Sequence, residues 1–380
     1  MKIGTRILHT GNEIDPETGA VSVPIHHAST FRQKKADEFG TYEYSRGGNP
    51  TRDALESIIA NLEGGTTGFA FASGMAAISS VLMIFSPGDH LVVCEDVYGG
   101  TYRALTKLFS RFGMETTFAD FTDPDKVKAA LRPNTKAVFA ETPSNPLLKI
   151  TDLRAIAAIA RENGLISIVD NTFMTPYLQR PMEFGFDVVI HSATKYLGGH
   201  SDILAGLVVA KDEHLAQRIK FIQNSFGAVL GPQDSWLVMR GIKTLKARME
   251  LHQKGARQIA EWLVKCPQVT EVFFPGLPGH PGKAIHDSQA DGPGGMVTFR
   301  LESEELTKKF LSNIELATLA VSLGAVESII SYPVTMSHAG MHPDHRKRVG
   351  VTGDLVRFSV GLEDPEDLIA DMSEALAKSR

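Results

Sequence analysis

The sequence predicts an α/β protein whose main domain is a mostly parallel sheet covered by helices on both faces. From about residue 68 to residue 210, short apolar runs typical of buried strands alternate with helical runs. Past Gly231 the pattern changes to longer helical windows, followed by a less regular mixture of strands and helices. A chain of 380 residues is also long for a single domain, so we expect a second, smaller α+β domain at the C-terminal end.

The chain divides into three regions on this pattern. Residues 1–46 carry turn signals such as Asp15-Pro-Glu-Thr-Gly19 and little periodic structure, so they cannot form a core alone. We expect this N-terminal arm to lie across another surface, either its own domain or a second subunit. Residues 47–246 are expected to form the large domain, and residues 247–380 the small domain.

Local signals place the individual elements in order. A helix at 55–62 follows Asn49-Pro50, which is typical of a helix start, and ends before Gly64-Gly65. Apolar runs bounded by polar or turn residues predict strands at 68–72, 91–95, 137–141, 166–170, 187–191, 294–300 and 354–361. Helical windows predict further helices at 153–161, 235–248, 251–265 and 304–311.

Composition indicates an ordinary globular protein, with 43% hydrophobic and 22% charged residues. The formal charge of −5 gives no basic field that would attract nucleic acid or an anionic membrane, so neither partner is expected. The two cysteines, Cys94 and Cys266, form no C-x-x-C pair, which fits a reducing compartment. The first residues lack an apolar segment and no run approaches the length of a membrane span, so we expect a cytoplasmic protein.

The run Asp187-Val-Val-Ile-His-Ser192-Ala-Thr194-Lys195 reads as a strand that ends in a cluster of hydroxyl groups and a lysine. A lysine just past a buried strand loses part of its hydration, which lowers the pKa of its amine and makes it a nucleophile toward aldehydes. Lys195 is therefore a candidate for forming a Schiff base. A solvated loop lysine would show the same local pattern, so the assignment depends on its neighbours.

Asp170 supplies the first such neighbour, because the apolar run Ile166-Ser-Ile-Val-Asp170 also ends in a polar side chain. The carboxyl ends of parallel strands line one crevice, so Asp170 and Lys195 are expected to face the same ligand. Pyridoxal phosphate requires this pair of groups. The lysine carries the aldehyde, and the carboxylate keeps the ring nitrogen protonated so that the ring accepts electrons.

Two other readings of local motifs are disfavoured. Ser192-Ala-Thr-Lys195 matches the S-x-x-K signature of acyl-enzymes, but the companion motifs Ser-Asp-Asn and Lys-Thr-Gly are absent and the serine closes a strand. His338, His342 and His345 could suggest a metal site. Gly340 and Pro343 interrupt that stretch, so it is not a helix that presents histidines on one face, and no metal is expected.

Further residues could bind the phosphate and the ring of such a cofactor. Ser73-Gly74-Met75 joins a strand to a helix, which brings backbone N–H groups and the positive end of the helix dipole to one point. Tyr98 follows the next strand and could stack on a flat ring. A plain turn and a packed tyrosine would show the same residues, so both readings stay open here.

Four more positions carry polar groups that suit this site. Asn145 lies between Pro143 and Pro146, which hold it rigidly beside the crevice. Arg357 lies within an apolar strand and needs an anionic partner, either a substrate carboxylate or a protein acid. Tyr44 and Arg46 could clamp a phosphate or remain solvated in a loop.

Taken together, these motifs resemble the Cys/Met-metabolism pyridoxal phosphate enzymes, which include cystathionine γ-synthase, the cystathionine β- and γ-lyases and methionine γ-lyase. The resemblance covers nearly the whole chain and rests on Tyr44-Ser-Arg46-x-x-Asn49-Pro-Thr, Ser73-Gly74-Met75-Ala-Ala, Asp96-Val-Tyr98-Gly-Gly-Thr, Glu141-Thr-Pro-Ser-Asn145-Pro, Val169-Asp170-Asn-Thr-Phe, Ser192-Ala-Thr-Lys195-Tyr and Arg357-Phe-Ser-Val-Gly-Leu-Glu. It implies an aspartate-aminotransferase-like fold (fold type I) and a homotetramer assembled as a dimer of dimers.

The resemblance also implies a role for each matching residue. Lys195 would bind the cofactor and transfer protons, Asp170 would pair with the ring nitrogen, and Tyr98 would stack on the ring and assist in proton transfer. The phosphate would be held by the backbone of Gly74 and Met75, by Ser192 and Thr194, and by Tyr44 and Arg46 of the neighbouring subunit. Asn145, Ser322 and Arg357 match positions that contact the ring hydroxyl or the substrate carboxylate.

Two departures from the family bear on the substrate. Gly100 stands where methionine γ-lyases carry a cysteine, which disfavours methionine. Val321 stands before Ser322-Leu-Gly where many γ-lyases and γ-synthases carry a glutamate, so an anchor for a distal ammonium group is missing. We expect a carbon–sulfur lyase acting on L-cystathionine or a close sulfur amino acid, by β- or γ-elimination. Cystathionine γ-synthase, methionine γ-lyase and a cofactor-binding protein without turnover remain alternatives.

Overall fold

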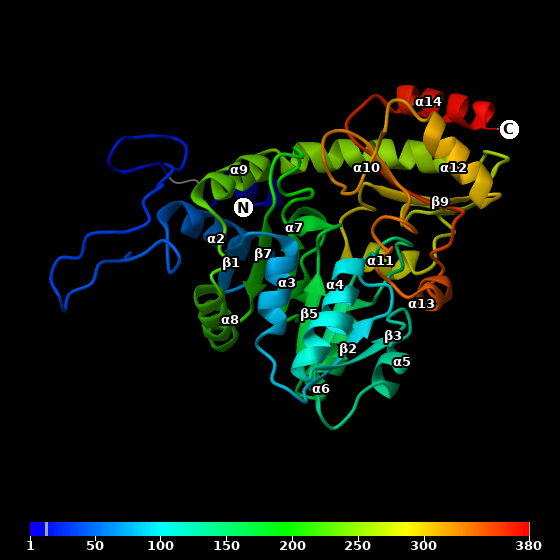
Figure 1. Cartoon of the computed structure of the whole chain (residues 1–380). Coiled ribbons are helices and arrows are strands. Elements are labelled where there is room, and N and C mark those ends of the chain that lie inside the picture. Colours follow the sequence, from blue (N-terminus) through cyan, green and yellow to red (C-terminus); the bar gives the residue numbers. More distant parts are fainter. Residues whose placement is uncertain (12–13, 380) are drawn as a thin grey trace.

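The computed structural model, which describes residues 1–11 and 14–379, contains two sheets that each have their own buried core (Figure 1). The larger sheet has seven strands in the order β1-β7-β6-β5-β4-β2-β3. Its strands are β1 (Thr67–Phe71), β2 (His90–Cys94), β3 (Glu115–Ala119), β4 (Thr135–Glu141), β5 (Ile166–Asp170), β6 (Val188–Ser192) and β7 (Gly206–Ala210). β7 runs antiparallel to both of its neighbours and the other ladders are parallel, which confirms the predicted mostly parallel sheet.

Helices cover the larger sheet on both faces. The α-helices that precede residue 244 are α1 (Ile3–His9), α2 (Pro50–Glu63), α3 (Gly74–Leu82), α4 (Gly99–Arg103), α5 (Pro124–Ala129), α6 (Leu153–Glu162), α7 (Thr175–Leu178), α8 (Glu213–Phe226) and α9 (Pro232–Lys243). Gly68 and Gly206 point to opposite faces, because Gly206 pairs with Phe71 and side chains alternate along a strand. A Cβ on Gly68 would lie 2.1 Å from the Glu56 carbonyl oxygen of α2, and one on Gly206 2.2 Å from the Ser73 carbonyl before α3.

The smaller sheet has five strands in the order β10-β11-β12-β9-β8. They are β8 (Val269–Phe273), β9 (Met296–Leu301), β10 (Thr318–Leu319), β11 (Ile329–Ser331) and β12 (Leu355–Ser359), and they are accompanied by α10 (Leu245–Leu263), α11 (Lys283–Gln289), α12 (Glu304–Asn313), α13 (Pro343–Arg348) and α14 (Pro365–Lys378). Apart from the β10–β11 ladder the pairs are antiparallel. The mixture agrees with the expected α+β character of this part of the chain.

Helix α10 connects the two cores. Its first turns bury Leu245 and Met249 in the core of the larger sheet, whereas Ala256 and Leu263 belong to the core of the smaller sheet. The sequence predicted a boundary between two helices at residues 248–251, but the helices α9 and α10 meet at Thr244. The helix continues past residue 248 because buried Met249 extends its apolar face. The expected domain limit at residue 246 lies just inside α10 and stays a prediction. None of the helices in the described residues is long and apolar enough to cross a membrane.

The chain begins with α1, a short helix that the sequence did not predict, whose Ile7 is fully buried against the body of the protein. The described residues between 14 and α2 form an arm that extends away from the two sheets (blue in Figure 1). The arm joins the body at α2, where the buried Asn49 side chain accepts hydrogen bonds from the N–H groups of Thr51 and Arg52. The Asn49 amide also donates to the His26 carbonyl at 2.9 Å. One side chain therefore caps the helix and fastens the arm.

Replacing Asn49 with alanine should lower the stability of the protein. The change removes the cap of α2, which typically costs about 1 kcal/mol, and leaves the His26 carbonyl without its donor. We expect a lower midpoint of urea unfolding for Asn49→Ala. Asn134→Ala is the matched control, because the Asn134 amide donates one hydrogen bond to the Gly88 carbonyl at an exposed position. Equal midpoints for the two variants would contradict the double role of Asn49.

Candidate active site

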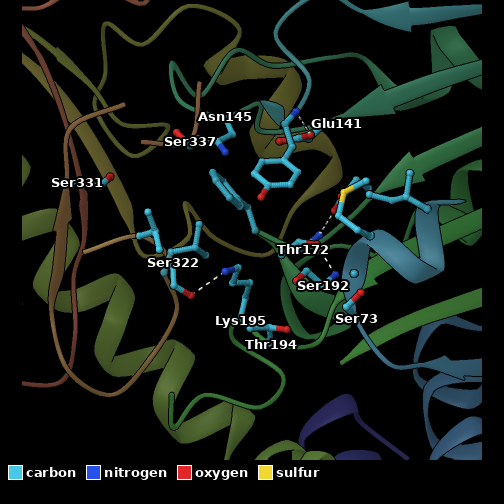
Figure 2. A pocket seen from close by; sticks show the side chains of 18 of the residues that line it. Ser73, Glu141, Asn145, Thr172, Ser192, Thr194, Lys195, Ser322, Ser331 and Ser337 are labelled. Carbon is cyan, nitrogen blue, oxygen red and sulfur yellow. Dashed lines mark hydrogen bonds between the residues drawn. The ribbon is translucent and has the colours of Figure 1, made fainter. Parts of the chain in front are cut away.

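A cavity of about 360 Å³ lies where the carboxyl ends of the central strands of the larger sheet meet the smaller sheet (Figure 2). The larger sheet contributes Glu141 from the end of β4, Asp170 from β5 and Ser192 from β6. The smaller sheet contributes Ser331 from β11 and Arg357 from β12. The expected convergence of strand ends on one crevice is therefore present, and a second wall comes from the C-terminal part of the chain.

Lys195 lies on the floor of this cavity, in the turn that follows β6. Its Nζ donates a hydrogen bond to the Ser322 hydroxyl at 2.7 Å, across the boundary between the two sheets (Figure 2). Burial, and then the positive charge of Arg357, lowers the pKa of Lys195 from 10.5 to about 8. The amine is thus largely buried and easily deprotonated, as a nucleophile toward an aldehyde must be.

Asp170 lies at the end of β5 and is 7% exposed. One carboxylate oxygen accepts a hydrogen bond from the Thr172 N–H at 3.0 Å. Burial raises the pKa of Asp170, and within residues 1–11 and 14–379 this carboxylate forms no ion pair. A buried carboxylate is stable in its charged form only beside a cation, and a protonated ring nitrogen is a cation of the right kind.

Glu141 is a second buried acid in the cavity, which the sequence reasoning did not select as a site residue. It pairs in register with Asp170 in the β4–β5 ladder. Burial, and then the charge of Asp170, raises the pKa of Glu141 well above its usual range. Its Oε2 accepts a hydrogen bond from the Tyr98 N–H at 2.9 Å. The sequence did contain a signal for Glu141, because this residue ends an apolar strand that precedes the Asp170 strand.

The N-terminus of α3 forms a cup at one end of the cavity. The Ser73 hydroxyl accepts a hydrogen bond from the Ala76 N–H at 3.1 Å, which caps the helix, and Gly74 and Met75 line the cavity. A Cβ on Gly74 would lie 2.8 Å from the Ser192 hydroxyl, so only glycine lets the helix approach the end of β6 this closely. With the hydroxyl groups of Ser192 and Thr194 at its edge, this cup fits a phosphate group.

Arg357 is 3% exposed and forms no ion pair with an acid in the described part of the chain. Its guanidinium donates to the Asn145 side-chain oxygen at 3.1 Å and to the Ser322 carbonyl at 2.8 Å, while its Nε has no partner among the described residues. Burial lowers the pKa of Arg357 to about 10. The alternative of a protein acid as its partner is therefore not realised, and a substrate carboxylate is a suitable ligand.

Ser322 joins the two cationic side chains of the site. Its hydroxyl accepts from Lys195 and its carbonyl accepts from Arg357, at distances of 2.7 Å and 2.8 Å. Its φ of 97° lies in the left-handed region, a strained conformation for a serine of the kind found at functional sites. Val321 beside it is 64% exposed and lies at the mouth of the cavity. Tyr98 also lines the cavity and is 37% exposed.

Tyr44 and Arg46 do not reach this cavity within one chain. They line a separate hollow of about 210 Å³ beside residues 227 and 229–232. Arg46 lies over the Tyr44 ring and donates to the Asn224 side-chain oxygen at 3.3 Å. Their contribution to a neighbouring subunit stays a prediction. Of the three histidines considered as metal ligands, His338 and His345 contact separate backbone carbonyls, and no cluster of metal-ligating side chains is found in the described residues.

The fold and the cavity together define a pyridoxal-phosphate-dependent enzyme. Lys195 and Asp170 fit the aldehyde and ring nitrogen, and the cup at Gly74 fits the phosphate. The family described as Cys/Met metabolism PLP-dependent enzyme matches residues 4–377, so the chain belongs to this family. The predicted family, fold class and cofactor are thereby confirmed.

Similar proteins agree with this assignment. The chain is 55% identical to the cystathionine beta-lyase of Bacillus subtilis over 98% of its own length and 95% of that protein's. It is 54% identical to the cystathionine gamma-lyase of the same organism, over 99% of both chains. The crystal structure of cystathionine gamma-lyase from Lactobacillus plantarum complexed with L-serine matches with a TM-score of 0.98 and 48% identity, covering 100% of this chain and 99% of that one.

The lowered pKa of Lys195 predicts a distinct pH dependence for its labelling. Below pH 8 the amine is protonated and unreactive, and above pH 8 it is neutral, so reductive methylation of the apoprotein should label Lys195 with a midpoint of about 8. Peptide mass spectrometry would follow this labelling against that of other lysines. Arg357→Gln should raise the midpoint, because the Arg357 charge contributes to the shift. A midpoint near 10.5 in the unmodified chain would contradict the assigned environment.

Proposed function

We propose that the protein is a carbon–sulfur lyase that cleaves L-cystathionine and releases a thiol amino acid, ammonia and a 2-oxo acid. The observation that carries this proposal is the easily deprotonated Lys195 amine, held by Ser322 beside the buried Arg357. The names of the similar proteins support cystathionine as the substrate. When bound, pyridoxal phosphate supplies an electron sink for the charge that develops at the α carbon of the substrate.

The residues of the chain divide the work of elimination between them. Arg357 and Asn145 bind the α-carboxylate of the amino acid, because their side chains are hydrogen-bonded to each other and both line the cavity. Asp170 would pair with the positive ring nitrogen of the bound cofactor. The Lys195 amine removes the α-proton, and the Ser322 hydroxyl fixes its position.

Tyr98 is suited to protonate the departing sulfur. Its backbone is held by Glu141 at the end of β4, and its side chain lines the same cavity as Lys195. The acid or base that serves the leaving group must lie within reach of it, and a phenol can fill that role. Whether sulfur leaves from the β or the γ carbon depends on which proton Lys195 moves next. Val321 at the mouth offers no charge for a distal ammonium group, which favours β-elimination or mixed specificity.

Product identification tests this function. From L-cystathionine, β-elimination gives homocysteine, pyruvate and ammonia, whereas γ-elimination gives cysteine, 2-oxobutyrate and ammonia. We expect one of these product sets, with thiol and ammonia released in equal amounts, and no turnover by Lys195→Ala. Turnover only of an activated homoserine ester with cysteine would favour a γ-synthase, and methanethiol release from methionine would favour a methionine γ-lyase. Cofactor binding without any product would support the binding protein without turnover.

We further propose a homotetramer, assembled as a dimer of dimers, in which Tyr44 and Arg46 reach the cofactor phosphate of the neighbouring subunit. The support is geometric. The two side chains are exposed at the base of an arm that stands away from its own body, and they carry the phenol and guanidinium groups that suit a phosphate (Figure 1). A cytoplasmic location and the domain limits at residues 46 and 246 belong to the same proposal, and the two free cysteines agree with a reducing compartment.

Mixed subunits test the shared site. Arg46→Ala should weaken cofactor retention and Lys195→Ala should abolish turnover. Co-expression of the two variants should recover activity, because a mixed dimer contains one site with both native residues. Random pairing would restore about a quarter of the sites. Activity equal to the sum of the two separate variants would contradict a contribution of Arg46 to the neighbouring subunit.

A further inference from the structure

Ser337 and His338 lie in the segment between β11 and α13, which packs against the larger sheet. His338 is fully buried. Its Nε2 lies 3.0 Å from the Asn145 carbonyl oxygen, and its Nδ1 lies 2.8 Å from the Ser337 hydroxyl. The histidine therefore links the C-terminal part of the chain to the loop after β4, which carries Asn145. The proposed chemistry does not use this side chain directly.

The hydrogen bonds fix the tautomer of His338. A carbonyl oxygen can only accept, so Nε2 carries the hydrogen and donates to Asn145. In a neutral ring Nδ1 then accepts from the Ser337 hydroxyl. Burial, and then the charge of Arg357, lowers the pKa of His338 to about 4, so the ring is neutral near neutral pH. The imidazole thus presents one donor in one fixed direction.

Asn145 transmits this contact to the substrate site. Its carbonyl accepts from His338, and its side-chain oxygen accepts from Arg357 at 3.1 Å. Arg357 in turn donates to the Ser322 carbonyl, and the Ser322 hydroxyl accepts from Lys195. Four hydrogen bonds, joined through the covalent structure of Asn145, Arg357 and Ser322, therefore connect His338 to the catalytic lysine. Figure 2 shows Ser337 and Asn145 on one side of the cavity and Ser322 and Lys195 on the other.

The same segment also contacts the loop that carries Tyr98. A Cβ on Gly99 would lie 2.1 Å from the Ser337 carbonyl oxygen, so the two backbones are in direct contact at a position that only glycine allows. Ser337 and His338 therefore meet two loops of the larger sheet, one before α4 and one after β4. Both loops bear side chains that line the cavity.

We propose that His338 is a positioning residue that orients Asn145 and Arg357 for the α-carboxylate of the amino-acid substrate. This inference rests on the proposed function, in which Arg357 binds that carboxylate. His338 itself touches none of the reacting atoms. It acts through Asn145, because it donates to the backbone carbonyl of the residue whose side-chain oxygen accepts from Arg357.

A comparison of two ligands, one with and one without a carboxylate, distinguishes this positioning role of His338 from a role in packing alone. L-alanine has no β leaving group and can bind without elimination, and L-alaninamide lacks the carboxylate. The affinity of the holoenzyme for each would be measured from the change in absorption of the bound cofactor. We expect His338→Phe to keep the cofactor absorption and to lower the preference for L-alanine about tenfold, as when the hydrogen bonds of Asn145 and Arg357 to the carboxylate are weakened by about 1.4 kcal/mol. His338→Gln should restore the preference, because its amide can donate from nearly the same place.

Two controls make the outcome decisive. His286→Phe removes another buried histidine whose Nε2 contacts a backbone carbonyl, that of Gly292 at 2.9 Å, and it should leave the preference unchanged. If His338→Phe fails to hold the cofactor, Ser337→Ala is the second variant. It removes the hydroxyl donor to Nδ1 from a residue that also lines the cavity, and it should lower the preference by a smaller factor. A native enzyme without any preference for L-alanine would overturn the proposed role of Arg357. A native preference that survives in His338→Phe, or in Ser337→Ala where that variant is needed, would overturn the role of His338.

Discussion

The hydrogen bond between Lys195 and Ser322 is the interaction on which the site depends. It joins a lysine at the end of a strand of the larger sheet to a serine that precedes the β11 strand of the smaller sheet, 127 residues away. Because Ser322 adopts a left-handed backbone conformation, its hydroxyl reaches Lys195 while its carbonyl reaches Arg357. The cavity is therefore complete only when the two sheets are packed together, and α10, which contributes to both cores, maintains that packing.

Two buried acids and two buried bases face the same cavity. Asp170 and Glu141 lie at the ends of neighbouring strands of the larger sheet, and Lys195 and Arg357 are linked through Ser322 toward the smaller sheet. Burial raises the pKa of both acids and lowers the pKa of both bases, so the cavity favours the neutral form of all four groups. A ligand with a cationic ring nitrogen at one end and a carboxylate at the other satisfies both pairs of groups at once.

Much of this site could be predicted from local sequence. Lys195 and Asp170 each follow an apolar run, and residues at the ends of parallel strands necessarily meet at one edge of a sheet. Glu141 follows the same rule, because it also ends an apolar strand. In that segment, however, only Asn145 was predicted to be a site residue, from the prolines on either side of it. The short helix α1 was missed because its burial depends on contact with α2 and α9, which no local pattern encodes.

The sequence by itself determined the alternation of strands and helices, the position of the lysine and the carboxylate, and the family, because these follow from residue type and spacing along the chain. Only the tertiary structure decided what Arg357 contacts, how His338 is joined to Asn145, and that Tyr44 and Arg46 stay outside their own cavity. The physical reason is that these contacts join residues far apart in the chain. The packing of the two sheets sets the distances between these donor and acceptor atoms, and a hydrogen bond forms only when the two atoms lie within about 3.2 Å.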